Sequence, residues 1–315
     1  MQKPGLDRHG RSERLPVLER IKGRAKRLYP PPPQKEGSEH TIFSCVSGLR
    51  YLYSYIMKWL ILRGLVREQR HWGMFRADFE RMLKQTDPMA EVHAIDFPGF
   101  GTESHRPSPA SISEIVDDLR SRWRSLSTGT KEAPEPWGLL AISLGGMVAM
   151  NWTSRYPGDF QRLVLINSSA TGLSPLYKRM KPSNYPHIFG LFFQRDLFSR
   201  EKKILELTTN LKGEALETRA RWNTEIAKEI RQADAAAQIL SALRFKTPKA
   251  IPVPTLVLSS KGDTLVDYSC SERIAHRFGA RLAIHDTGNH DLSIDAPEWI
   301  AAEVTAWLRD QAPGI

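Results

Sequence analysis

Three segments of the 315-residue chain contain side chains whose types and order suit nucleophilic catalysis. Ser143 follows an apolar run and precedes two glycines in LLAISLGGMVAMNW, residues 139–152. Asp263 comes after the apolar run TLVLSS, and His290 comes after the run RLAIH. A serine hydroxyl becomes a nucleophile when a histidine takes its proton, and that histidine needs a carboxylate to orient it. The chain order serine, acid, histidine is one of the orders in which such triads occur.

The segment around Ser143 predicts a tight strand–turn–helix connection known as a nucleophile elbow. In this turn the serine adopts strained backbone dihedrals, and the residues two before and two after it must be small. The usual pattern is Gly-x-Ser-x-Gly; here Ala141 replaces the first glycine, and Gly145 is the second. A helix that begins directly after Ser143 would favour negative charge beside it. The alternative interpretation is that Ser143 simply caps a helix.

Asp263 and His290 each follow a predicted strand, and open α/β sheets build their sites at such strand ends. Asp267 is an alternative to Asp263 as the acid. His285 lies inside its strand and is expected to be structural, whereas His290 lies beyond the strand end. A metal site at residues 285–291 is a further alternative, although the histidines and aspartates there lack a recognised ligand spacing. We therefore predict a triad that needs no metal or other cofactor.

Acyl transfer also needs N–H donors for the negatively charged oxygen of its tetrahedral intermediate. The N–H of Leu144, directly after the serine, is the first predicted donor. The second is expected in the loop after the apolar run at residues 59–62, where Leu65 follows the turn Arg63-Gly64. Loss of one such donor typically costs about 10²–10³ in rate.

Short apolar runs alternate with stretches of helical periodicity over most of the chain. Predicted strands lie at 59–62, 92–95, 138–142, 163–166, 255–258 and 281–285, and predicted helices at 75–83, 112–126, 145–156, 270–278 and 298–308. This alternation favours an α/β fold, a doubly wound and mostly parallel sheet with helices on both faces. Residues 51–55 are an additional strand candidate.

Two regions depart from this alternation. Residues 1–40 are basic and end in Tyr-Pro-Pro-Pro-Pro at 29–33, which predicts a flexible N-terminal extension. A basic amphipathic helix that contacts a membrane or a partner is the alternative for this extension. Residues 171–250 have helical periodicity and no strand pattern. They predict a helical cap inserted into a core formed by residues 41–170 and 251–315.

Composition limits the class of protein. Apolar residues make up 41% of the chain and charged residues 25%, which is typical of soluble globular proteins. Cys45 and Cys270 allow neither a disulfide framework nor a thiolate zinc site, and they fit a reducing compartment. The N-terminus lacks the apolar stretch of a secretory signal, and residues 51–66 are too short and too charged to span a bilayer. The sequence therefore predicts a cytoplasmic protein without a transmembrane segment.

The net charge of +10 is concentrated in two segments. Residues 1–40 have a net charge of +5, and residues 171–250 have +7 from 15 Lys/Arg and 8 Asp/Glu. A uniformly basic nucleic-acid-binding protein would differ from this pattern, so no nucleic-acid partner is expected. The basic predicted cap suggests an acidic partner or substrate, although a solvated helical face is the simpler interpretation.

Five segments, spread over about residues 41–310, together resemble the α/β-hydrolase superfamily. In chain order they are WLILRGLVREQRHWGMF, AIDFPGFG, AISLGGMVA, SSKGDTLV and TGNHDLSIDAPEWI. They are similar to the oxyanion loop, the Asp-x-Pro-Gly-x-Gly turn, the elbow, the acid loop and the histidine loop. The resemblance implies the triad, the fold and a lid-like cap. Arg63 departs from the family, which usually has a structural histidine there, and we expect altered loop packing without loss of chemistry.

A serine nucleophile excludes the members of this superfamily that use aspartate. The sequence therefore predicts a carboxylesterase-like serine hydrolase that forms an acyl-enzyme on Ser143, with His290 activating the water. A thioesterase or acyltransferase for carrier-linked or lipid acyl groups is the alternative, since the basic cap resembles that of esterases acting on carrier proteins. A non-catalytic binding module is a third possibility, which the complete set of Ser, Asp and His argues against.

Overall fold

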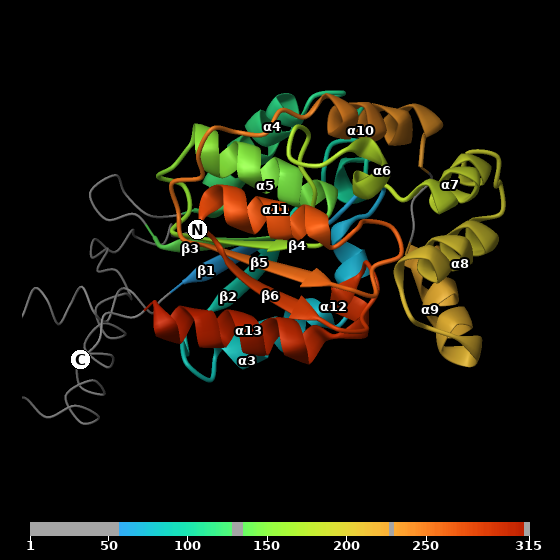
Figure 1. The fold of residues 1–315 in the computed structure, drawn as a ribbon. Coiled ribbons are helices and arrows are strands. Elements are labelled where there is room, and N and C mark those ends of the chain that lie inside the picture. The colour runs from blue at the N-terminus through green and yellow to red at the C-terminus, as the bar shows by residue number, and fades with distance from the viewer. Residues whose placement is uncertain (1–56, 128–134, 227–229, 312–315) are drawn as a thin grey trace, which may run out of the picture. The chain divides into compact units, whose positions relative to one another are not determined.

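Six parallel strands form the central sheet of the folded unit that contains all described residues (Figure 1). The structure is a computed structural model that describes residues 57–127, 135–226 and 230–311. The strands lie in the order β2-β1-β3-β4-β5-β6, and every neighbouring pair is parallel. Their bounds are β1 Lys58–Leu62, β2 Glu91–Ala94, β3 Trp137–Ile142, β4 Arg162–Ile166, β5 Thr255–Ser260 and β6 Arg281–His285. The predicted α/β fold class is confirmed. The N-terminal extension and the candidate strand at 51–55 lie outside the described residues.

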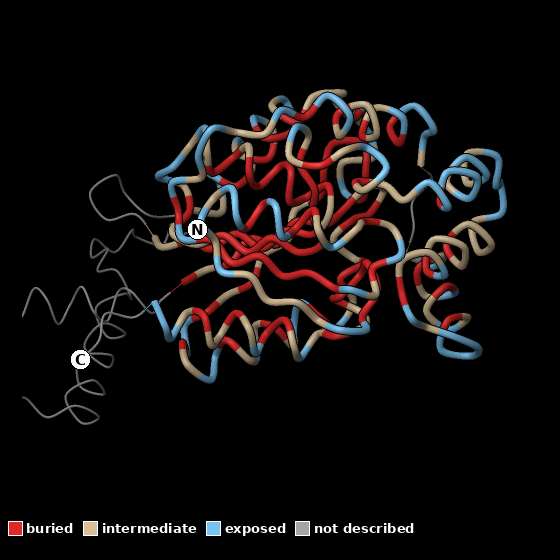
Figure 2. The backbone as a smooth tube through the Cα atoms, in the orientation of Figure 1, coloured by how far each residue is buried: buried red, intermediate tan, exposed pale blue. Residues whose placement is uncertain are grey.

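The central strands are buried on both faces, as the continuous apolar runs in their sequences require. Every residue of β3 and β5 is buried. Parallel strands covered by helices on both sides lack the alternation of polar and apolar residues that marks a half-exposed strand. Figure 2 shows the sheet as a buried layer between partly exposed helices.

Helices cover the two faces of the sheet and enclose two separate apolar cores. One core lies under α4 (Ile112–Leu126), α5 (Leu144–Arg155) and α11 (Ser269–Phe278). The other lies under α3 (Phe75–Leu83) and α13 (Pro297–Asp310). Each of these helices was predicted, because an apolar stripe at helical spacing marks the face that packs on the sheet. In α4 the buried stripe is Ile112, Ile115, Val116, Leu119 and Trp123.

Between β4 and β5, the described residues of the range 171–250 form an inserted helical segment at the carboxyl edge of the sheet (Figure 1). Its helices are α6 Leu176–Arg179, α7 Tyr185–Leu191, α8 Leu197–Thr208, α9 Gly213–Ile226 and α10 Gln232–Arg244. The described part of this segment contains no strand, in agreement with its predicted helical character. Short helical turns complete the fold at η1 Gln69–Trp72, η2 Gly101–Glu103, η3 Pro182–Asn184 and α12 Leu292–Asp295. Within the described ranges, no helix combines the length and hydropathy needed to cross a bilayer.

Candidate active site

Ser143 lies in a strained turn between β3 and α5. Its backbone has φ 56° and ψ −119°, a region that residues other than glycine rarely adopt. Three hydrogen bonds hold the turn. The Ser143 N–H donates to the Ile166 carbonyl (2.9 Å), and the Ser143 carbonyl accepts from the Gly146 N–H (2.9 Å) and the Ser168 hydroxyl (2.8 Å). Such strain costs roughly 1–3 kcal/mol and persists only where the surroundings enforce it. The turn therefore has the strained geometry that the elbow pattern predicts.

Small residues make this turn possible on both sides of Ser143. A Cβ added at Gly145 would lie 2.5 Å from the Arg63 carbonyl oxygen and 2.8 Å from the Leu62 carbonyl oxygen. No side chain fits there, because real Cβ atoms essentially never approach other atoms within 3.0 Å. Ala141 replaces the usual first glycine, and its methyl group is completely buried in β3, opposite Leu62. The extra methyl group is thus accommodated in the core without opening the turn.

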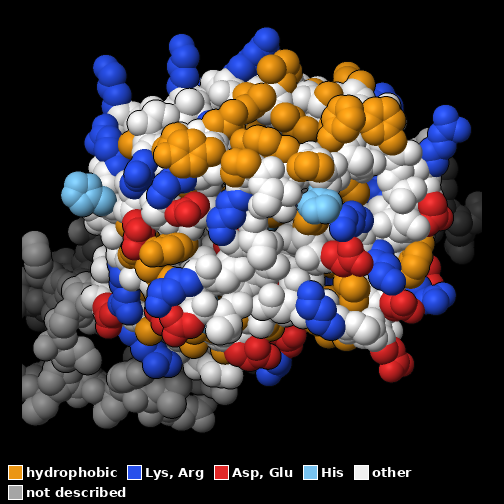
Figure 3. All heavy atoms as spheres, turned by 45° about the vertical axis from the view of Figure 1, so that its right-hand side comes forward, with side chains coloured by type: hydrophobic (Ala, Val, Ile, Leu, Met, Phe, Trp, Pro, Cys, Tyr) orange, Lys and Arg blue, Asp and Glu red, His pale blue; other side chains and the backbone are white. Residues whose placement is uncertain are grey.

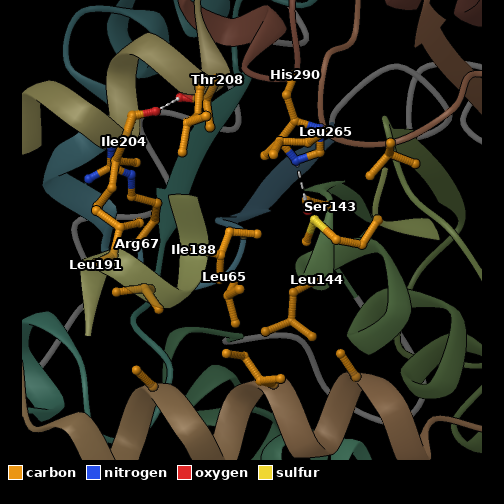
Figure 4. Close-up of a pocket in the computed structure, with 18 of the residues that line it drawn as sticks. Leu65, Arg67, Ser143, Leu144, Ile188, Leu191, Ile204, Thr208, Leu265 and His290 are labelled. Carbon is orange, nitrogen blue, oxygen red and sulfur yellow. Dashed lines mark hydrogen bonds between the residues drawn. The ribbon is translucent and has the colours of Figure 1, made fainter. Parts of the chain in front are cut away.

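The three predicted catalytic side chains form one hydrogen-bonded chain, of which Figure 4 shows the contact between Ser143 and His290. His290 Nε2 lies 2.9 Å from the Ser143 hydroxyl oxygen, and His290 Nδ1 lies 2.8 Å from Asp263 Oδ2. The other carboxylate oxygen of Asp263 accepts hydrogen bonds from the N–H groups of Leu265 (2.8 Å) and Val266 (2.9 Å). Both N–H groups fix the orientation of the carboxylate, which in turn fixes the imidazole. The arrangement has the geometry of a serine, histidine and aspartate triad.

The alternative residues lie elsewhere. Asp267 Oδ1 accepts a hydrogen bond from the Ser269 N–H (3.0 Å) and does not contact His290. His285 Nδ1 accepts from the Gly288 N–H (2.8 Å), a contact that shapes the loop leading to His290. Among the described residues, no group of three or more His, Cys, Asp or Glu side chains could hold a metal ion.

The charge around His290 favours its protonated form. Burial disfavours the imidazolium, but the negative charge of Asp263 and its hydrogen bond outweigh burial, so the pKa of His290 lies above its ordinary value. Asp291 adds to this effect, and the Arg63 guanidinium opposes it. A histidine with a raised pKa accepts a proton more readily, as a general base must.

The two predicted oxyanion donors belong to residues close to Ser143. Leu144 is the first residue of α5. Leu65 directly follows Gly64, and a Cβ added at Gly64 would lie 3.1 Å from Ser143 Cβ. Neither the Leu144 N–H nor the Leu65 N–H donates to a described protein acceptor. Figure 4 shows both leucines beside Ser143. Their role as donors remains a prediction.

Arg63 forms a buried ion pair that the sequence alone does not reveal. Its guanidinium contacts both carboxylate oxygens of Asp291, at 2.6 Å and 3.3 Å, and the Ser293 hydroxyl at 3.1 Å. The same guanidinium lies over the Trp72 ring, 4.6 Å from its centroid. The pair joins the loop after β1 to the loop that holds His290. Two features of the sequence point to this contact: the acid Asp291 follows the candidate base His290, and an arginine replaces the usual histidine at residue 63.

We expect Arg63→Met to lower the free energy of unfolding by about 3–5 kcal/mol, because it leaves the buried Asp291 carboxylate unpaired. Arg63 holds the pKa of Asp291 at about 2 against the cost of burial. That value lies below the ~3.9 of an unfolded aspartate, so the pair stabilises the protein above pH ~4 and loses its effect as the pH falls toward 2.

Urea denaturation of Arg63→Met beside the double variant Arg63→Met/Asp291→Asn tests this expectation. The double variant removes both charges and should recover part of the lost stability. If the double variant is less stable than Arg63→Met, Arg63 does not act mainly by neutralising Asp291.

A cavity of about 470 Å³ opens at Ser143 and His290. Its size lies within the usual range of small-molecule sites, roughly 300–1,000 Å³. The walls come from the loop after β1, from α5 and from the inserted helical segment. Apolar side chains dominate them, among others Leu65, Leu144, Met147, Ile188, Leu191, Ile204, Ile239 and Leu265. Figure 4 shows several of these side chains between Ser143 and the inserted helices.

Arg67 ties the loop after β1 to the inserted helical segment. Its Nη1 lies 2.5 Å from Glu201 Oε2 of α8, and the two side chains are 7% and 0% exposed. Asn223 of α9 donates to the same carboxylate oxygen (3.1 Å). On α10, the Gln238 side chain accepts from the Val66 N–H (2.8 Å). The inserted helices thus hold the two residues that directly follow the predicted donor Leu65.

The sequence matches a protein family over residues 70–297, well over half of the chain; the family is described as "Serine aminopeptidase, S33". The chain therefore belongs to this family and is an α/β-hydrolase. The resemblance inferred from the five sequence segments is confirmed.

Curated relatives match over a shorter stretch. The pimeloyl-(acyl-carrier protein) methyl ester esterase of Vibrio campbellii is 31% identical over 100 residues, 31% of this chain and 34% of that enzyme. The corresponding enzyme of Photobacterium profundum is 35% identical over 98 residues, 31% of this chain and 34% of that enzyme. The matched stretch thus spans about a third of the length of these relatives.

Solved structures share the fold. A meta-cleavage product hydrolase from Pseudomonas fluorescens superposes with a TM-score of 0.62 at 16% identity, over 81% of this chain and 91% of that chain. A thermophilic esterase from Thermogutta terrifontis has a TM-score of 0.60 at 18% identity, over 81% of this chain and 90% of that chain. At these identities the likeness establishes the fold alone.

Proposed function

We propose that the protein is a serine hydrolase that cleaves a carboxylic ester through an acyl-enzyme on Ser143. The observation that supports this most is the continuous hydrogen-bonded chain from the Ser143 hydroxyl through His290 to Asp263, at 2.9 Å and 2.8 Å. This chain opens into a largely apolar cavity. The names of the curated relatives, which are methyl ester esterases, favour an ester over other acyl substrates.

In the first half of the proposed reaction, Ser143 attacks the ester carbonyl carbon while His290 Nε2 takes the hydroxyl proton. Asp263 stabilises the imidazolium that forms and remains ionised. The carbonyl oxygen becomes an oxyanion, which the N–H groups of Leu144 and Leu65 would stabilise. Collapse of this intermediate breaks the bond to the leaving alcohol, which receives the proton from His290. The products are the free alcohol and an acyl ester on Ser143.

In the second half, a water molecule replaces the alcohol. His290 takes a proton from the water, whose oxygen attacks the acyl carbon, and the same two N–H groups stabilise the second oxyanion. His290 then returns the proton to the Ser143 oxygen, and the carboxylic acid leaves. If an alcohol or amine entered in place of water, the same steps would give acyl transfer.

Because the walls of the cavity are largely apolar, they favour an apolar acyl group as the part of the substrate that the cavity binds. We further propose that residues 171–250 act as the cap that was predicted, because α7, α8 and α10 supply much of the cavity wall. In this arrangement the inserted helices would select the acyl chain, and the core would supply the chemistry.

The family description also raises an aminopeptidase as a candidate. An aminopeptidase must bind the positively charged amino terminus of a peptide, which calls for an unpaired carboxylate. Among the described residues that line the cavity, Asp291 is the sole acid, and it is paired with Arg63. Arg179 and Arg200 also line the cavity, have no carboxylate partner among the described residues, and would repel an ammonium group. The charges therefore favour an ester.

A thioester or ester linked to an acidic carrier protein is a second candidate substrate. The net charge of +7 on residues 171–250 favours it, since an acidic carrier would be attracted to this segment. On this view the KM for a carrier-linked ester rises steeply with salt, while the KM for a small neutral ester does not.

Hydrolysis of a panel of p-nitrophenyl esters with increasing acyl length tests the proposed function. We expect kcat/KM to rise from acetate to medium-length chains, because each buried methylene contributes about 0.8 kcal/mol while the cavity has room. An amino-acid p-nitroanilide serves as the peptide-like comparison and should be a much poorer substrate. Rapid turnover of the anilide without turnover of any ester would contradict the proposal.

A further inference from the structure

The inserted helical segment exposes an unusual number of large apolar side chains. Six of the nine strongly exposed large apolar residues in the described part of the chain lie on it. They are Leu176 (52% exposed), Tyr177 (58%), Tyr185 (43%), Phe189 (65%), Phe193 (69%) and Leu243 (47%), which we call the apolar face. Figure 3 shows hydrophobic side chains gathered over this part of the molecule, with Lys and Arg at the border. A contiguous patch of this kind marks an interaction surface, whereas single exposed apolar residues do not.

Helix α7 lies at the centre of this feature. Its sequence is YPHIFGL, and none of its residues is buried. A helix that is apolar on nearly all sides is normally buried in a protein core or a membrane. Phe189 and Phe193 contact each other, with ring centroids 5.0 Å apart, and both remain more than half exposed. Within the described residues, α7 therefore lacks the apolar surroundings that its sequence requires.

The apolar face surrounds the entrance of the catalytic cavity. Leu176, Tyr185, Phe189 and Leu243 belong to the face and also line the cavity that contains Ser143. Whatever covers the face therefore covers the entrance as well. A second copy of the chain would close the entrance and would have to leave for each turnover. A lipid surface would cover the same side chains and supply acyl esters directly at the entrance.

Charge favours a lipid surface with anionic headgroups. Arg195 and Arg244 lie next to the apolar face in sequence, and both side chains are exposed. Neither forms an ion pair with any residue that the structure describes. The whole segment has a net charge of +7. Surfaces that bind membranes reversibly combine exposed aromatic and aliphatic side chains, which enter the interface, with cations that contact anionic headgroups.

We propose that the apolar face docks on an anionic lipid surface and that the acyl ester enters the cavity from this surface. The docking follows from exposure and charge and is independent of the chemistry at Ser143. The entry of the ester rests on the proposed function. The catalytic edge of the sheet would then face the lipid, with α7 inserted shallowly among the headgroups.

Vesicle sedimentation with the full chain tests the docking. The Ser143→Ala variant is used so that no lipid is consumed, with vesicles of phosphatidylcholine alone or of an equimolar mixture of phosphatidylcholine and phosphatidylglycerol. We expect binding to the anionic vesicles that weakens as salt rises. Tyr177→Glu/Phe193→Glu, which alters residues of the face that do not line the cavity, should weaken this binding at least ~10-fold.

Met74→Glu/Met89→Glu is the matched control. These methionines are 70% and 49% exposed, lie outside the inserted helical segment, and add the same two negative charges. The control should change vesicle binding less than ~2-fold, and with Ser143 present both double variants should hydrolyse a water-soluble ester as the unaltered protein does.

Three results would overturn the docking. The first is that the protein does not bind anionic vesicles, and the second is that both double variants weaken vesicle binding equally. The third is that the protein binds no vesicles but forms a dimer, which Tyr177→Glu/Phe193→Glu dissociates and the control variant does not. The last result would assign the face to a second copy of the chain. Vesicle binding by a protein that cleaves no ester would refute the proposed function and leave the docking intact.

Discussion

Ser143→Ala is expected to lower kcat for a carboxylic ester by roughly 10⁴–10⁶-fold. The substitution removes the oxygen that lies 2.9 Å from His290 Nε2 and that is proposed to become acylated. The fold should persist, because the turn is held by the Ser143 backbone and by Ser168 rather than by the Ser143 hydroxyl. We expect the free energy of unfolding to change by less than about 1 kcal/mol.

Ser169→Ala is the matched control for this prediction. Ser169 also lines the cavity and is buried, but its hydroxyl contacts Arg179 Nε at 3.4 Å instead of His290. Its loss should cost less than ~10-fold in kcat/KM, because it removes one weak polar contact. Steady-state kinetics on one soluble ester, with thermal unfolding of each variant, provides the comparison. Equal losses in the two variants would show that the assay reports damage to the cavity rather than loss of the nucleophile.

Asp263→Asn is expected to lower kcat by about 10⁴-fold while leaving the fold intact. The amide oxygen of Asn can still accept from the N–H groups of Leu265 and Val266, which contact Asp263 Oδ1 at 2.8 Å and 2.9 Å. The amide NH₂ then faces His290 Nδ1, which must become an acceptor. The proton of the neutral imidazole therefore moves to Nε2, where it prevents His290 from taking the serine proton.

The pH profile separates this loss of function from a structural one. His290 must be neutral to act as a base, and Asp263 raises its pKa above the ordinary value. The acid limb of kcat/KM in the unaltered protein should thus have its midpoint above pH ~6.5. In Asp263→Asn the residual activity should show this limb at lower pH. Asp267→Asn, at the alternative acid, should leave rate and profile unchanged.

The fold and the proximity of Ser143, Asp263 and His290 could be predicted because their signals are local. Each strand is a short apolar run, and Ser143, Asp263 and His290 each follow one of these runs. In a parallel sheet all strands end at the same edge, so three residues that are far apart in sequence are brought together by topology. The bounds of α3 and α4 match their predictions for a similar reason, since a regular apolar stripe specifies both the helix and its buried face.

The contacts that surround the triad could not be predicted in the same way. Arg63 and Asp291 are 228 positions apart, and no periodic pattern pairs one charged residue with another at that distance. Arg67 and Glu201 likewise meet only because the inserted helical segment folds over the loop after β1. The exposed apolar surface of α7 was also missed, because an apolar run in a sequence ordinarily predicts a buried helix.

Labelling with a fluorophosphonate, followed by mass spectrometry of the digested protein, tests the central claim most directly. These reagents react with serines that an adjacent base has activated, so they report on the nucleophile without knowledge of the substrate. We predict one adduct, on the peptide that contains Ser143, and no adduct at this position in Ser143→Ala. A folded protein that takes up no label, or one labelled at another residue with Ser143 unmodified, would contradict the assignment of Ser143 as the nucleophile.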